Sequence, residues 1–225
     1  MYFIQEYGQY SNFVFIGEAG SGKSEIAVNI AQLLTAGQEK PVHFFDLDMT
    51  KPIFRSRDLA QTLAEAGIQV HFEEQYMDAP TLTGGVVRLL KDESSVSVLD
   101  VGGDAIGARS IGGYAPYLNR ENTCIFYVVN SYRPWSADIE HIDQVLSQIL
   151  GVSHIHLQRL VFLGNPNLGI ETTAEEFLRG CDELDKVLGA YVSVAFYCVE
   201  EKLMSKLTTE RKLLPLHLQM GYEWQ

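Results

Sequence analysis

NFVFIGEAGSGKSEIAVNIAQLL, residues 12–34, contains the motif from which the fold of this 225-residue chain can be inferred. Its first residues, 12–16, are mostly apolar and predict a short strand. Residues 17–24, GEAGSGKS, match the pattern G-x-x-x-x-G-K-[ST], and residues 25–36 predict an amphipathic helix. This order of strand, glycine-rich loop and helix identifies a Walker A phosphate-binding loop, or P-loop. The alternative, a glycine-rich turn without a ligand, explains neither the full match nor its context.

The P-loop predicts that the chain binds a nucleoside triphosphate with Mg²⁺. Its glycines let the backbone turn so that successive N–H groups face phosphate oxygens, and the following helix presents its positive dipole end. Lys23 would reach the β- and γ-phosphates and assist phosphate transfer, and Ser24 would bind Mg²⁺. We therefore expect the nucleotide to contact Gly17, Glu18, Ala19, Gly20, Ser21, Gly22, Lys23, Ser24 and Glu25.

Short apolar segments alternate with longer amphipathic segments along the rest of the chain. Further strands are predicted at residues 41–45, 68–72, 96–101, 123–129, 160–163 and 191–199. Further helices are predicted at residues 58–66, 83–91, 136–150 and 173–188, the last with the capping-box pair Thr173 and Glu176. This alternation predicts an α/β fold, with a mostly parallel sheet between two layers of helices, as in P-loop NTPases. We expect one domain, residues 1–225, with a core of about 10–200 and a C-terminal tail, 201–225.

Asp100 lies near the end of the predicted strand 96–101, and Val101 separates it from two glycines. An acidic residue at a strand end beside a P-loop can hold a magnesium-bound water. The spacing is also D-x-x-G, in which the Gly103 amide can approach a γ-phosphate. The alternative is a solvated aspartate in a Gly-Gly turn, and the neighbouring P-loop favours the functional interpretation.

Asp48 follows the predicted strand 41–45, in the sequence Asp46-Leu47-Asp48. A carboxylate there would orient the attacking water or bind Mg²⁺, so Asp48 is a catalytic and a metal-binding candidate; the alternative is a polar exit from the strand. Three cations come next, and they could contact phosphate, a second subunit or an acidic partner, or form a surface ion-pair network with Asp58. They are Lys51, Arg55 and Arg57.

Asn165 follows the predicted strand 160–163. Its amide offers a paired donor and acceptor that can recognise a purine edge; the alternative is a turn, since Asn-Pro and Asn-Leu-Gly favour turns. The guanine-reading pattern Asn-Lys-x-Asp is absent, because Leu168 stands where the aspartate would be. We therefore expect ATP rather than GTP.

Composition and charge exclude several classes of function. The formal net charge is −12, which repels nucleic acid and anionic lipid, and the densest basic cluster is small (Lys206, Arg211 and Lys212). The start of the chain lacks the features of a signal peptide, and no apolar run is long enough to span a bilayer. The three cysteines have no metal-binding or disulfide spacing. We expect a cytoplasmic protein without nucleic acid or stable membrane association.

These motifs together resemble the MinD/ParA-like P-loop proteins of the SIMIBI class, also described as CobQ/CobB/MinD/ParA nucleotide-binding domains. The resemblance covers about residues 10–200 and rests on four segments: residues 17–24, DLDMTKPIFRSRD at 46–58, LDVGGD at 99–104 and LGNPNLG at 163–169. It implies a nucleotide-dependent homodimer. It also implies roles for individual residues: nucleotide and magnesium binding by Lys23 and Ser24, hydrolysis by Asp48, the Walker B function by Asp100 and adenine contact by Asn165.

One position departs from this family pattern. Partitioning ATPases of the class carry a lysine directly after the first P-loop glycine, where this chain has Glu18. We expect one of the cations at 51–57 to supply the missing charge.

Three interpretations of the function remain open from the sequence. The first is a regulatory ATPase whose nucleotide state controls an unidentified protein partner. The second is a small-molecule enzyme of the same fold, such as a dethiobiotin-synthetase-like ligase or a kinase, which would need a substrate pocket built from loops 102–120 and 130–136. A nucleotide-binding module with negligible hydrolysis is a third interpretation.

Overall fold

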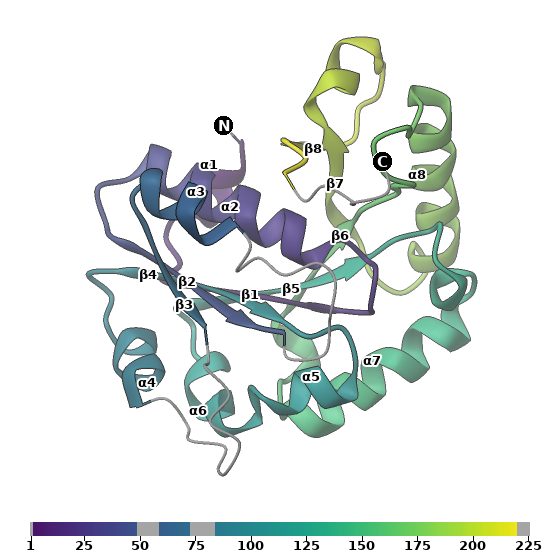
Figure 1. Cartoon of the computed structure of the whole chain (residues 1–225). Helices are drawn as coiled ribbons and strands as arrows, with labels where there is room; N and C mark the ends of the chain where they lie inside the picture. The colour runs from purple at the N-terminus through teal and green to yellow at the C-terminus, as the bar shows by residue number, and fades with distance from the viewer. Residues whose placement is uncertain (1, 49–58, 73–83, 220–225) are drawn as a thin grey trace.

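A computed structural model describes residues 2–48, 59–72 and 84–219, and its central feature is one eight-stranded sheet (Figure 1). Every strand pairing is parallel, in the order β3-β2-β4-β1-β5-β6-β7-β8. The predicted α/β fold with a parallel sheet is confirmed. The segment at 123–129, β5, lies near the middle of the sheet beside β1.

The strands are β1 (Asn12–Gly17), β2 (Val42–Leu47), β3 (Ile68–Phe72), β4 (Val96–Val101), β5 (Thr123–Val129), β6 (Leu160–Gly164), β7 (Val194–Glu200) and β8 (Leu213–Leu216). The α-helices are α1 (Tyr2–Tyr7), α2 (Lys23–Gly37), α3 (Ala60–Glu65), α4 (Gly84–Leu90), α5 (Ala105–Arg109), α6 (Ala115–Leu118), α7 (Ile139–Ser153) and α8 (Ala174–Leu188). A short 3₁₀ turn, η3 (Pro134–Ser136), precedes α7.

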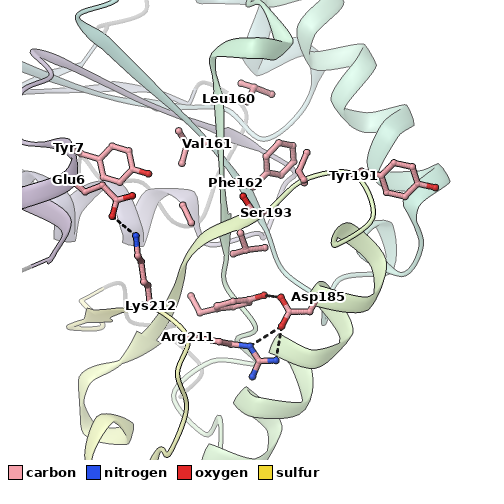
Figure 2. Close-up of a pocket in the computed structure, with 14 residues that line it drawn as sticks. Glu6, Tyr7, Leu160, Val161, Phe162, Asp185, Tyr191, Ser193, Arg211 and Lys212 are labelled. Atoms are coloured by element: carbon pink, nitrogen blue, oxygen red, sulfur yellow. Dashed lines mark hydrogen bonds and ion pairs between the residues drawn. The ribbon is translucent and has the colours of Figure 1, made fainter.

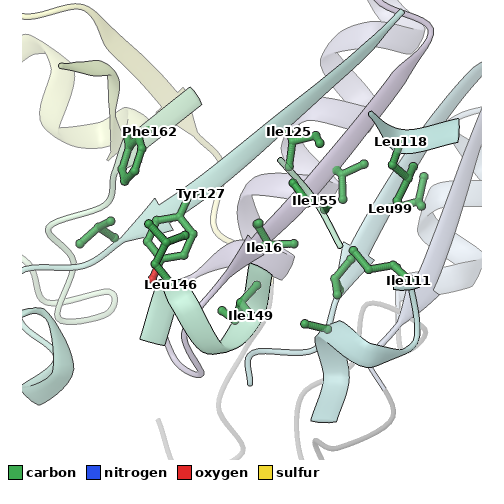
Figure 3. Packing of buried hydrophobic residues seen from close by; sticks show 14 of the residues in the cluster. Ile16, Leu99, Ile111, Leu118, Ile125, Tyr127, Leu146, Ile149, Ile155 and Phe162 are labelled. Atoms are coloured by element: carbon green, nitrogen blue, oxygen red, sulfur yellow. The ribbon is translucent and has the colours of Figure 1, made fainter. Parts of the chain in front are cut away.

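Alternate residues of β1 contribute to two different hydrophobic cores, because successive side chains of a strand point to opposite faces. Phe13 and Phe15 pack with α1, α2 and α3 on one face of the sheet. Val14 and Ile16 pack with helices α4 to α8 on the other face, and Figure 3 shows part of this second cluster. Figure 1 shows the sheet between α1–α3 and α4–α7. Since both faces are covered, the central strands carry apolar residues on both faces.

The N-terminal half contains helices that the sequence patterns did not predict. Helix α1 is short, and only Phe3 and Tyr7 of its six residues are buried, so it gives too little periodicity to recognise. Helices α5 and α6 are one-turn elements of five and four residues. Gly37, expected just beyond α2, is instead the last residue of that helix.

The C-terminal half differs from the prediction in two places. The segment Leu213–Leu216 forms the edge strand β8, where Pro215 is tolerated because an edge strand has one unpaired side. Helix α7 begins and ends three residues later than the predicted helix 136–150, and its C-cap His154 has a left-handed conformation, with φ 57°. The predicted capping box of Thr173 and Glu176 is present at the start of α8.

The topology places the carboxyl ends of all eight parallel strands at one edge of the sheet. Strand β1 lies between β4 and β5, and the connections that leave this part of the sheet pass to opposite faces. In parallel α/β sheets, ligands bind in the crevice that forms at such a point. The loop 17–24 begins at this point. Among the described residues, none of the helices combines the length and the apolar character that crossing a membrane requires.

Candidate nucleotide-binding site

The loop 17–24 turns sharply between β1 and α2. Gly17, Gly20 and Gly22 have φ values of 135°, 77° and 94°, a region that side-chain-bearing residues rarely adopt. Gly22 is also the N-cap of α2. Because glycine has no side chain, it cannot cap the helix, and an anion can take that role.

Lys23, the first residue of α2, is only 1% exposed despite its charge. Its Nζ donates a hydrogen bond of 2.7 Å to the carbonyl of Glu18, and the Ser21 N–H donates to the same carbonyl at 3.2 Å. The loop therefore closes around the ammonium group. Ser24 is buried in the same turn of α2, and the contacts of both residues with phosphate and Mg²⁺ stay predictions.

Glu18 is half-buried in the loop. Burial raises the pKa of its carboxyl from 4.5 to about 7, although the nearby charges of Lys23 and His141 act to lower it. Burial also raises the pKa of the Tyr127 phenol, and the Glu18 charge adds to that effect. The P-loop of this chain therefore contains a carboxyl that titrates near neutral pH.

The turn after β4 lies directly against the P-loop. A Cβ at Gly103 would stand 2.6 Å from the Ala19 N atom and 2.8 Å from Lys23 Nζ, so this position has room only for glycine. The proximity that the D-x-x-G spacing predicted for Gly103 is therefore present. Its contact with a phosphate stays a prediction.

Acidic residues gather at the carboxyl ends of β2 and β4, next to the P-loop. Asp46 pairs with Asp100 in the register of the two strands. Asp48 follows, and its Oδ1 lies 3.1 Å from the point where a Cβ on Gly102 would stand. The Asp48 N–H donates to Asp46 Oδ1 at 3.1 Å, and all three aspartates are buried.

The described residues include no group of three or more histidines, cysteines, aspartates or glutamates that could hold a metal by themselves. Proteins usually bind Mg²⁺ through one or two carboxylates together with substrate phosphates and water. The hydroxyl of Ser24 and the carboxylates of Asp48 and Asp100 provide the hard oxygen donors that this ion prefers.

Asn165, at the end of β6, lies against the P-loop from the other side. Its Nδ2 donates to the Ser21 carbonyl at 2.7 Å, and a Cβ at Gly22 would stand 2.1 Å from that Nδ2. Because a carbonyl oxygen can only accept a hydrogen bond, the atom of the Asn165 amide that faces it is assigned as the nitrogen. Asn165 Oδ1 is buried and accepts no hydrogen bond from the part of the chain that is described.

Arg133 is a residue at this site that the sequence analysis left unassigned. It lies in the loop between β5 and α7, and its Nε donates to the Gly20 carbonyl at 2.9 Å. The sequence does contain one sign of this position. Arg133 follows shortly after the strongly apolar strand β5, and β5 is the neighbour of β1 in the sheet. The loop after β5 is also tied to the loop after β6, since Asn130 Nδ2 donates to the Asn167 carbonyl at 2.9 Å.

Glu25 lies in the first turn of α2, directly after the phosphate loop. Its Oε1 accepts the Gln219 N–H at 2.9 Å, so it connects α2 with the C-terminal segment, and its contact with nucleotide stays a prediction. The cations predicted to supply the missing charge lie outside the described residues: Lys51, Arg55 and Arg57.

A separate hollow of about 810 Å³ lies at the amino-terminal ends of β6 and β7, the edge of the sheet opposite the P-loop (Figure 2). Two cations line it, and both are paired there with carboxylates: Arg211 with Asp185 at 2.6 Å and Lys212 with Glu6 at 2.7 Å. The hollow is therefore less suited than the P-loop to bind a phosphate group.

The sequence profile of the CobQ/CobB/MinD/ParA nucleotide binding domain matches residues 13–161, more than half of the chain. Two solved structures are similar in fold, each in complex with GDP. Signal recognition particle receptor FtsY from Elizabethkingia anophelis has 11% identity and a TM-score of 0.46. Signal recognition particle 54 kDa protein from Aeropyrum pernix K1 has 12% identity and a TM-score of 0.36.

The two alignments cover 69% and 91% of this chain, but 49% and 37% of the solved chains, so this chain spans about half or less of their lengths. At these values the likenesses carry no argument about which nucleotide is bound. No curated protein matches the sequence.

Proposed function

Because the chain is a P-loop nucleotide-binding protein of the CobQ/CobB/MinD/ParA family, we propose that it binds ATP with Mg²⁺ and acts as a regulatory ATPase on a protein partner. The observation that carries the proposal is the buried Lys23 ammonium, held within the P-loop at the start of α2. This is the position in which the lysine of a Walker A loop reaches the β- and γ-phosphates of a bound nucleotide.

The hydrogen bonds of Asn165 support ATP over GTP. Its Nδ2 is engaged by the Ser21 carbonyl, which leaves Oδ1 as an acceptor. Adenine carries an amino donor at the position where guanine carries the acceptor O6. A contact in which Asn165 Oδ1 only accepts therefore favours adenine. Leu168 agrees with this, because it stands where a guanine-binding site has an aspartate.

The acidic residues beside the loop support hydrolysis. Bound Mg²⁺ would neutralise negative charge on the phosphates. Ser24 and Asp100 would hold the ion, Lys23 would bind the β- and γ-phosphates, and Asp48 would orient the attacking water. Gly103 allows the β4 turn to approach the γ-phosphate closely.

Exposed apolar side chains near the same edge of the sheet support a protein partner. Ile106 is 72% exposed and Trp135 54%, and they follow β4 and β5 respectively. Leu168 and Ile170, both exposed, follow β6. Apolar residues gathered beside a ligand site are typical of interaction surfaces. With a net charge of −12, a protein partner, including a second copy of the chain, is favoured over nucleic acid.

Binding is tested by titrating ATP–Mg and GTP–Mg into the wild type, Lys23→Ala and the control Lys186→Ala, which alters an exposed lysine on α8. We expect the wild type and the control to bind ATP more tightly than GTP, and Lys23→Ala to bind neither. Unchanged affinity in Lys23→Ala would contradict the assignment of this loop.

The regulatory role is tested by measuring phosphate release with a cell extract separated into a protein fraction and a small-molecule filtrate. Stimulation by the protein fraction is the expected result. Stimulation by the filtrate alone would replace the proposal with a small-molecule enzyme of the same fold.

A further inference from the structure

We propose that Arg133 is a second phosphate-binding cation of the P-loop, supplying within the same chain the positive charge that Glu18 does not provide. The inference rests on the proposed function and deepens it. Its geometric basis is the hydrogen bond from Arg133 Nε to the Gly20 carbonyl, which holds the guanidinium group against the loop at 2.9 Å. The Arg133 side chain also runs along Gly20, with its Nε 3.4 Å from where a Cβ would stand.

The charges around the loop favour a further cation. Carboxyl groups of Glu18, Asp48 and Asp100 lie at or beside the loop, whereas Lys23 is the cation of the motif itself. A polyphosphate adds more negative charge to this cluster, and its repulsion must be offset. Arg133 forms no ion pair with any carboxylate in the described ranges, so its charge is not already used there.

The chemistry of the side chain fits this role. A guanidinium has five N–H donors, and the bond to Gly20 uses only the one on Nε. The remaining donors form a planar fork that suits two oxygens of a phosphate group, which a lysine ammonium cannot match. Gly103 lies beside Lys23 Nζ on the β4 side of the loop, and Arg133 contacts the loop on the β5 side.

The backbone around Arg133 is held in place before any ligand binds. Its N–H donates to the Asn130 carbonyl at 3.0 Å, and its own carbonyl accepts the Ser136 N–H at 3.0 Å. The preceding Tyr132 is anchored through its hydroxyl, which donates to the Glu176 carbonyl at 2.5 Å. Because this loop is already ordered, binding loses less conformational entropy than it would with a flexible arginine.

The test uses three substitutions with different chemistry. Arg133→Lys keeps the charge, Arg133→Gln keeps an N–H donor for the Gly20 carbonyl without the charge, and Arg133→Ala removes both. Arg120→Ala is the control, because Arg120 lies before β5 at the opposite edge of the sheet. Each protein is titrated with ATP, ADP and inorganic tripolyphosphate, all with Mg²⁺, and its Tm is measured.

We expect Arg133→Ala and Arg133→Gln to weaken binding of all three ligands by about tenfold or more, the loss expected for a charge-assisted hydrogen bond. Arg133→Lys should recover part of the affinity, and the control should match the wild type. Wild-type affinity in Arg133→Gln would overturn the proposal, since Arg133 would then only brace the loop. Weaker ATP binding with unchanged tripolyphosphate binding would also overturn it, because the contact would be to the base or ribose.

The outcome for the wild type separates this inference from the proposed function. If neither the wild type nor the control binds any of the three ligands, the proposed function fails. If both bind and every Arg133 variant binds equally well with an unchanged Tm, only the role of Arg133 is refuted.

Discussion

Glu18 takes the position that is a lysine in related partitioning ATPases, and its carboxyl pKa of about 7 follows mainly from burial. The ionised form is the disfavoured one, so the charge appears in the folded protein only as the pH passes about 7. Above that pH the loop carries an additional negative charge close to where phosphate would bind.

We predict that the ATP affinity of the wild type falls by about three- to tenfold between about pH 6 and pH 8, relative to Glu18→Gln, because ionised Glu18 repels phosphate. Comparing the two proteins cancels the titration of the ATP phosphates themselves. Isothermal titration across this range provides the measurement. Parallel profiles for the two proteins would contradict the shifted pKa.

The same pKa shift affects stability, with a definite sign. The folded-state pKa is raised from 4.5, so the unfolded chain loses its proton first and stability falls as the pH rises from about 4.5 to about 7. Glu18→Gln removes this loss. Its Tm advantage over the wild type should therefore be larger at about pH 7.5 than at about pH 4.

Asp48 gives the third prediction at the residue scale. Its buried carboxylate lies beside the Gly102–Gly103 turn, which itself touches Lys23. If it orients water, Asp48→Asn should lower ATP turnover by about a hundredfold with little change in ATP affinity, because the interaction matters mainly in the transition state. Asp182→Asn, exposed on α8, is the control. Equal turnover in wild type and Asp48→Asn would leave Asp48 without a catalytic role.

At the scale of elements, the loops after β1, β5 and β6 form one connected unit. Arg133 and Asn165 donate to successive carbonyls of the P-loop, those of Gly20 and Ser21. Asn130 joins the two outer loops to each other. A ligand that shifts the P-loop therefore acts directly on the segment that carries the exposed Trp135.

We predict that Gly22→Ala destabilises this unit by roughly 1–3 kcal/mol, because φ is 94° and the added Cβ would stand 2.1 Å from Asn165 Nδ2. Denaturant unfolding measures the loss. Combining Gly22→Ala with Asn165→Ala should cost less than the sum of the two single changes, since removing the amide relieves the clash but not the backbone strain. Strict additivity would show that the two positions do not interact.

At the scale of the whole molecule, both termini of the described chain belong to the same folded unit. Helix α1 buries Phe3 and Tyr7 against the sheet, and β8 adds to its edge beside β7. The carbonyl and N–H of His217 bond to Asn29 of α2, at 3.0 and 2.7 Å. The segment after β8 is thus attached to the helix that follows the P-loop.

We predict that the chain unfolds in one cooperative transition and that ATP–Mg raises its midpoint as a whole. At a ligand concentration one hundred times Kd, the expected stabilisation is about 2.7 kcal/mol. Thermal unfolding followed both by far-UV circular dichroism and by tryptophan fluorescence should give coincident curves. Two separate transitions would contradict the prediction of a single domain.

Local sequence was sufficient for the features that depend on neighbouring residues. The P-loop is recognisable because its backbone conformation requires glycines at set positions, as Gly20 and Gly22 show. The parallel sheet follows from continuous apolar strands that alternate with amphipathic helices. Short helices with few buried residues, such as α1, were not predicted, because a periodic pattern of apolar residues can be recognised only over a longer segment.

Only the tertiary structure decided the features that depend on residues far apart in the chain. Gly20 and Arg133 are separated by 113 positions, and Ser21 and Asn165 by 144, so no local pattern reveals that they touch. The pKa of Glu18 likewise depends on how deeply the folded chain buries it. Parallel pairing of β1 with β5 brings the loop after β5, which carries Arg133, beside the P-loop. That adjacency is a property of the sheet, because strands that pair side by side place their carboxyl-end loops together whatever their distance in sequence.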